Sequence, residues 1–89
     1  IEYRDSKHIQ PVGEKVEGVV EFLDKRYSQQ WESYNYTCVL EGNLVSFMNK
    51  FDHAVGDRML VKGKVKAHTK NKLFSADETR LNYCKLYKL

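Results

Sequence analysis

Residues 56–72 read GDRMLVKGKVKAHTKNK, and this stretch decides the fold class. Apolar residues and lysines alternate along it. The apolar set is Met59, Val61, Val65 and Ala67, and the lysine set is Lys62, Lys64 and Lys66. Because successive side chains of a β-strand point to opposite faces, the pattern predicts a strand with one face in a core and the other lined with positive charge. Gly63 completes the apolar face, where a missing side chain allows a sharp coil or a close backbone contact.

Four further strands are predicted around this one. They cover residues 15–23, 31–40, 44–49 and a return over 73–87, and the strand of the opening stretch covers 58–69. Residues 24–30 are expected to form a polar loop, and Glu41-Gly42-Asn43 a tight turn. Asp77-Glu78 is expected to bulge or break the last strand. Residues 50–57 are too few to form more than one or two helical turns. In no segment do apolar residues recur with the 3.6-residue period of a helix.

The order of these strands favours one architecture. A three-stranded meander, an interrupted link and a hairpin are typical of an all-β, five-stranded OB-fold Greek-key barrel with little or no helix between strands three and four. An SH3-like barrel is the main alternative, although its strands are usually shorter. Residues 1–12, which hold the only proline, are expected to be an extended arm, and residues 13–89 the barrel.

Charge is unevenly distributed along the chain. Residues 1–57 hold six Lys/Arg against ten Asp/Glu, a net charge of −4, whereas residues 58–89 hold nine against two, a net charge of +7. This asymmetry indicates an anionic partner, and nucleic acid is the commonest one for a small basic domain. The lysine face of residues 58–69 has a plainer explanation, since it could be a solvated face that blunts a sheet edge. An acidic protein surface or an anionic membrane is the alternative anion. We expect nucleic acid, with protein subunits as further partners, and no membrane association.

Other classes of function find little support. An apolar content of 42% is enough for a folded domain, and no apolar run approaches membrane-spanning length. Cys38 and Cys84 fit no metal-ligand spacing, so they are interpreted as buried thiols in a reducing, intracellular compartment, the cytoplasm or nucleoid of a host cell. No nucleophile–base pair or phosphate-cradling glycine loop is visible, so neither catalysis, a metal nor a cofactor is expected. A chain that opens on Ile1 is expected to be a piece of a larger parent protein without a signal peptide before the domain.

Five segments taken in order resemble a known pattern. They are YNYTCVL at 34–40, Gly42-Asn43, Gly56-Asp57, VKGKVKAH at 61–68 and TRLNYCKL at 79–86. Together they resemble OB domains of the single-strand-binding type found in replication and phage proteins, over about residues 14–89. The loop after His68 departs from the pattern because it carries no glycine. The resemblance implies a non-catalytic module that binds single-stranded nucleic acid, DNA rather than RNA, within a replication, repair or recombination protein.

Such a module holds bases on aromatic rings and phosphates on cations. The aromatic candidates for base stacking are Tyr27, Trp31, Tyr34, Tyr36, Phe47 and Tyr83, which cannot all be exposed because a thin core needs aromatic residues too. Of these, Trp31, Tyr34 and Phe47 are the predicted contacts. Trp31 lies among polar residues at the edge of a loop. The alternative to a base contact is that its side chain covers the end of the barrel. The cationic candidates are Arg58, Lys62, Lys64 and Lys66 on the strand and Lys70 and Lys72 in the hairpin loop.

Two further points bear on this prediction. His68 is included as a contact to phosphate, or else as a residue that fixes the hairpin loop. The excess of Lys over Arg in residues 58–89 favours binding with little sequence preference. A protein–protein docking OB domain in a multisubunit assembly is the alternative function, and the acidic residues Glu14, Glu17 and Glu21 of the first strand favour it.

Overall fold

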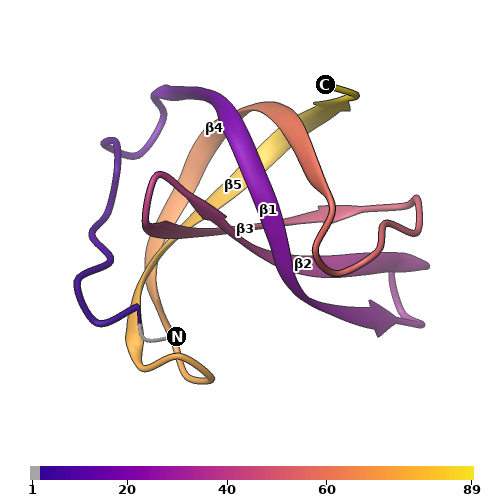
Figure 1. Cartoon of the computed structure of the whole chain (residues 1–89), viewed down its shortest axis with the longest axis horizontal. Helices are drawn as coiled ribbons and strands as arrows, with labels where there is room; N and C mark the ends of the chain where they lie inside the picture. Colours follow the sequence, from indigo (N-terminus) through magenta and orange to yellow (C-terminus); the bar gives the residue numbers. More distant parts are fainter. Residues whose placement is uncertain (1–2) are drawn as a thin grey trace.

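Five strands make up the computed structural model, which describes residues 3–89 and has no helix among them (Figure 1). They span Lys15–Ser28 (β1), Ser33–Leu40 (β2), Asn43–Asn49 (β3), Arg58–Asn71 (β4) and Ala76–Tyr87 (β5). Hydrogen bonds join them in a closed ring of order β1-β2-β3-β5-β4. All neighbours are antiparallel except β3 and β5, which are parallel. The predicted fold class, a five-stranded all-β barrel without a helix between strands three and four, is confirmed.

The strands begin and end a few residues from the predicted positions, since β2 begins at Ser33, β4 runs to Asn71 and β5 begins at Ala76. Two predictions within the strands are wrong. β1 continues through the expected loop to Ser28, which pairs with Ser33, because an antiparallel hairpin with a solvated face accepts polar residues. β5 is unbroken at residues 77–78, where Asp77 pairs with Lys70 and Glu78 with Thr69. The irregularity of β5 lies further along, beside Gly63.

The core follows the expected alternation of β4. Val61 and Val65 are buried, whereas Lys62, Lys64 and Lys66 are exposed. Both predicted faces of this strand are therefore present. The other buried apolar residues of the core cluster are Val16, Val20, Phe22, Tyr36, Cys38, Leu40, Val45, Phe47 and Leu81.

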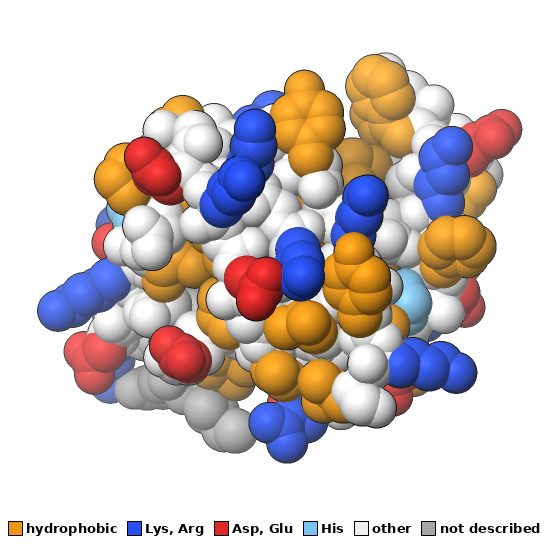
Figure 2. Space-filling view, turned by 90° about the horizontal axis from the view of Figure 1, so that it is seen from above, with side chains coloured by type: hydrophobic (Ala, Val, Ile, Leu, Met, Phe, Trp, Pro, Cys, Tyr) orange, Lys and Arg blue, Asp and Glu red, His pale blue; other side chains and the backbone are white. Residues whose placement is uncertain are grey.

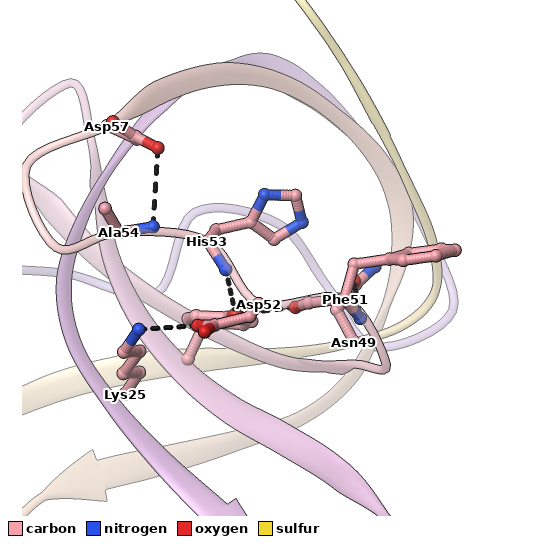
Figure 3. A network of polar contacts seen from close by, with 8 residues as sticks. Lys25, Asn49, Phe51, Asp52, His53, Ala54 and Asp57 are labelled. Atoms are coloured by element: carbon pink, nitrogen blue, oxygen red, sulfur yellow. Dashed lines mark hydrogen bonds and ion pairs between the residues drawn. The ribbon is translucent and has the colours of Figure 1, made fainter.

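Residues 50–57, the link between β3 and β4, close one side of the barrel (Figure 3). The ring of His53 stacks on Phe22, with centroids 5.3 Å apart. The Tyr36 hydroxyl donates to the Phe51 carbonyl at 2.7 Å and accepts from the His53 amide at 2.7 Å. Because these contacts join the link to β1 and β2, it stays fixed without a helix.

The described part of the predicted arm packs along the other side of the barrel in Figure 1. The Ser6 hydroxyl donates to the Asp77 carbonyl at 2.6 Å and accepts from the Leu44 amide at 2.7 Å. His8 stacks on His68 with ring centroids 4.4 Å apart, and Ile9 packs against the core. The arm is therefore part of the folded domain and covers the outer face of β3 at Leu44.

Candidate functional site

A cleft of about 410 Å³, which we call the hairpin cleft, opens between the second half of β1, β2 and the β4–β5 hairpin. Its cationic lining residues are Arg26 of β1, Lys70 at the end of β4 and Lys72 in the hairpin loop. The carboxylates of Asp24 and Glu78 line it too, and Arg26 Nε lies 3.4 Å from Asp24 Oδ2. Asn35 and Thr37 of β2 also line it and offer hydrogen-bonding groups. Of the predicted cations, only Lys70 and Lys72 belong to this cleft.

The carboxylate of Glu78 fixes the hairpin beside this cleft. Glu78 is only 8% exposed, and its oxygens accept hydrogen bonds from Ser46 Oγ at 2.8 Å, Asn71 Nδ2 at 2.7 Å and Thr69 Oγ1 at 3.2 Å. The Asn71 side-chain oxygen in turn accepts from the Phe74 amide at 2.9 Å. A buried carboxylate needs such donors. The network therefore sets the position of the hairpin that carries Lys70 and Lys72.

Arg80 was missed from the sequence, although it stands in the TRLNYCKL segment. Its Nη1 donates to Asn35 Oδ1 at 2.6 Å and to Ser46 Oγ at 3.2 Å. The side chain thus crosses the outer face of β3 from β5 to β2. It links the hairpin cleft to the surface of β5, a connection that only the closed barrel creates.

The aromatic side chains near the turn between β1 and β2 differ in how far they are exposed to solvent. The side chain of Trp31 is 64% exposed, which fits a contact residue and does not fit the alternative of a lid. Tyr34 is half-buried, with its ring 5.1 Å from that of Tyr27 and 5.9 Å from that of Tyr36. The Lys25 ammonium lies 5.7 Å from the Tyr34 centroid. Trp31 is therefore the freer stacking surface.

Two predicted contact residues are placed elsewhere. Phe47 is completely buried, with its ring 6.1 Å from Tyr36, so its prediction as a nucleic-acid contact is wrong. His68 Nε2 lies 2.6 Å from the Gln10 carbonyl, and its ring face is stacked on His8. Both its Nε2 atom and its ring therefore contact the arm, and neither contacts the hairpin loop. His68 is not part of the candidate site.

Two lysines of β4, Lys62 and Lys64, face a second cleft of about 380 Å³, here called the lysine cleft. Lys62 and Lys64 line it together with Lys15 of β1, Lys85 of β5 and the ring of Tyr83. Viewed onto the side where β5 ends, cationic side chains stand among hydrophobic ones (Figure 2). Lys66 lies in a smaller hollow with Arg80 and Tyr83, and Arg58 is exposed at the start of β4, paired in register with Glu21. The structure thus divides the predicted cations between different surfaces.

The two cysteines are free thiols. Burial raises the pKa of Cys38, and burial raises the pKa of Cys84 from 9.0 to about 11. Because the thiolate is the reactive form, both groups are weak nucleophiles at neutral pH.

Comparison with models of known protein families, with curated proteins and with solved structures found no match for this chain. Within residues 3–89, no helix has the length and apolar character needed to cross a membrane.

Proposed function

We propose that this barrel is an OB fold of the single-strand-binding type and that its hairpin cleft binds single-stranded nucleic acid with little sequence preference. One observation carries the proposal: Arg26 of β1 and the lysines Lys70 and Lys72 of the β4–β5 hairpin converge on a single cleft. Within the closed ring, this cleft lies between the β1–β2 side and the β4–β5 hairpin. An OB fold uses the loops at these two places to bind its ligand.

The chemistry of the cleft suits a flexible polyanion. Lysine ammonium groups are mobile point charges that follow phosphates without demanding a fixed geometry. Asn35 and Thr37 add neutral hydrogen-bonding groups to the lining. The exposed ring of Trp31, at the turn between β1 and β2, offers a stacking surface to an unpaired base. Bases inside a duplex are stacked on each other, so this combination favours a single strand. The preference for DNA, and for a replication, repair or recombination protein as the parent, rests on the resemblance described above.

A protein-docking domain is the second candidate. Phe51 and Val55 in the link between β3 and β4 are 74% and 57% exposed, and exposed apolar side chains favour a partner protein when they lie together. The acidic residues Glu14, Glu17 and Glu21 are also exposed and would face a basic partner. In that case the cationic clefts would contribute little to binding.

Fluorescence of Trp31 during titration with oligo(dT) at low salt tests the proposal, because Trp31 is the only tryptophan. We expect quenching, and weaker binding when Lys70→Ala and Lys72→Ala are combined. Lys7→Ala combined with Lys50→Ala is the matched control, since it removes the same charge from exposed positions elsewhere. An absence of binding, or equal losses in the two double variants, would reject the hairpin cleft as the site.

A further inference from the structure

β5 contains a β-bulge opposite Gly63. Lys62 pairs with Lys85, but Lys64 pairs with Asn82, so two residues of β5, Tyr83 and Cys84, face one residue of β4. Tyr83 has a φ of +54°, in the left-handed region that glycine and asparagine favour and that bulky side chains rarely adopt. The bulge is therefore built on an unfavourable residue type.

The bulge changes which side chains of β5 face the solvent. Leu81 is buried, so strict alternation would point Tyr83 inward as well. Instead Tyr83 is 82% exposed, the highest exposure of any aromatic side chain in residues 3–89, while Cys84 and Leu86 pack against the core. The bulge shifts the inward and outward alternation of β5 by one residue, so that Cys84 and Leu86 face the core, and this is reason enough for a bulge here. It does not explain a tyrosine there, because a ring this exposed contributes little to the core and asparagine or glycine would suit the backbone better.

The surroundings of Tyr83 indicate what its ring could bind. It lines the lysine cleft with Lys15, Lys62, Lys64 and Lys85, and Glu17 is the one carboxylate in that lining. Lys62 Nζ lies 3.5 Å from Glu17 Oε1 and 5.4 Å from the centroid of the Tyr87 ring, so it bridges the acid and a second aromatic residue. An open ring among four lysines is the combination that binds a base together with its neighbouring phosphates.

The lysine cleft is connected to the hairpin cleft across the barrel surface. Tyr83 also lines the smaller hollow that holds Lys66 and Arg80. Arg80 donates to Asn35, and Asn35 lines the hairpin cleft. The side chains of Tyr83, Arg80 and Asn35 thus link one cleft to the other, with Lys66 beside Arg80.

We propose that Tyr83 is a second base-stacking residue and that a bound single strand, after filling the hairpin cleft, continues across Arg80 and Lys66 onto the lysine cleft. This inference rests on the proposed function and extends it to a longer site. It assigns Lys62, Lys64 and Lys66 to phosphates of the second segment of the strand. It also predicts that only oligonucleotides long enough to leave the hairpin cleft respond to Tyr83.

The test compares Tyr83→Asn with Tyr83→Phe. Asparagine tolerates the left-handed backbone but has no ring, whereas phenylalanine keeps the ring. Fluorescence anisotropy would measure the affinity for oligo(dT) of about 15 and about 5 nucleotides, near the two ends of the range that OB folds cover. We expect Tyr83→Asn to weaken the longer ligand about 5- to 150-fold, the effect of losing one stacked base, and to leave the shorter one unchanged. Tyr83→Phe should bind both like the native chain.

Stability and charge are controlled separately. The melting temperature of Tyr83→Asn should equal or exceed that of the native chain, and Tyr83→Gly, which accepts the same φ, replaces it if that variant fails to fold. Each single-strand phosphate that a cation neutralises contributes about 0.7 to the slope of log K against log salt. Lys62→Ala combined with Lys64→Ala should therefore reduce this slope by about 1.4 for the longer ligand and leave it unchanged for the shorter one.

Several results would overturn the inference. If Tyr83→Asn binds the longer ligand normally while the Lys70/Lys72 double variant does not, the strand uses the hairpin cleft alone and the proposed function stands. Equal losses for the two lengths would make the lysine cleft the first contact and not the second. If neither ligand binds at low salt, both proposals fail. If the Lys62/Lys64 double variant instead loses binding to vesicles of phosphatidylserine and phosphatidylcholine, the lysine cleft is a membrane surface.

Discussion

Gly63 lies so close to Cys84 that a Cβ atom on residue 63 would stand 2.7 Å from the Cys84 sulfur. The same atom would lie 3.1 Å from the Asn82 carbonyl oxygen. Gly63 faces the bulge of β5, so its missing side chain makes room for the extra residue there. The outward direction of Tyr83 thus depends on a glycine in the neighbouring strand.

Gly63→Ala is expected to destabilise the domain by about 1–3 kcal/mol, the usual cost of overpacking. The Cys84 side chain could rotate away, but the Asn82 carbonyl belongs to the backbone and cannot. Urea unfolding would measure the loss. Gly18→Ala is the matched control, because the atoms nearest its Cβ would belong to the Leu40 side chain, with a terminal methyl 2.5 Å away, and not to the backbone. A loss as large at Gly18 would contradict this explanation.

Tyr36→Phe should destabilise the domain by about 1–3 kcal/mol, because it leaves the His53 amide and the Phe51 carbonyl without their partner. The core loses no carbon atom, so the effect isolates the hydrogen bonds of the link between β3 and β4. Thermal unfolding measures it. Tyr27→Phe is the control, since Tyr27 is 53% exposed and should unfold like the native chain. No difference between the two variants would mean that water replaces the hydroxyl at no cost.

The two faces of β4 could be predicted from the sequence because apolar residues and lysines alternate along it, as buried and exposed positions do in a strand. The same rule failed for β3. Leu44 and Ser46 lie on one face and Val45 and Phe47 on the other, yet all four are buried. Ser6 of the arm bonds to the Leu44 amide, and the side chains of Glu78 and Arg80 bond to the Ser46 hydroxyl. Since these partners lie 32 to 38 residues away, no local pattern could show that Phe47 faces the core.

The candidate binding surfaces were predictable only in part for a similar reason. Lys70 and Lys72 could be placed in the hairpin from their own neighbours, but Arg26 and Arg80 reach the same region only when the ring of strands closes. The bulge at Tyr83 was hidden because Leu81 and Cys84 both pack on the core although they are three residues apart, which breaks the alternation that the prediction relied on.

The thiols should resist alkylation in the folded protein. Burial raises the pKa of Cys84 to about 11, so iodoacetamide at about pH 8 should modify neither cysteine until urea is added, because it needs the thiolate. Mass spectrometry reads the result, and rapid modification of Cys84 in the native chain would contradict it. The folded state holds the Cys84 proton that an unfolded thiol releases near pH 9. Stability should therefore fall as the pH rises from about 9 to 11.

Oligonucleotide binding should weaken steeply with salt. Each neutralised phosphate of a single strand contributes about 0.7 to the slope of log K against log salt, so three to five engaged cations predict a slope of about −2 to −3.5. Titrations at several salt concentrations measure it. Lys64→Ala combined with Lys66→Ala should flatten the slope for a long ligand by about one unit or slightly more. An unchanged slope would remove β4 from the interface.

Trp31→Ala should weaken binding about 5- to 150-fold, the effect of losing one stacked base, without changing the salt slope, because no charge is removed. The variant should melt close to the native chain, since the side chain is 64% exposed and little of its surface is buried by folding. Phe51→Ala is the matched control: Phe51 is 74% exposed but lies in the link between β3 and β4, so it should leave the affinity unchanged. Equal losses at both positions would show that the effect is not specific to stacking on Trp31. A collapse of the melting transition in Trp31→Ala would instead show that this ring stabilises the turn between β1 and β2 and that binding is lost through unfolding.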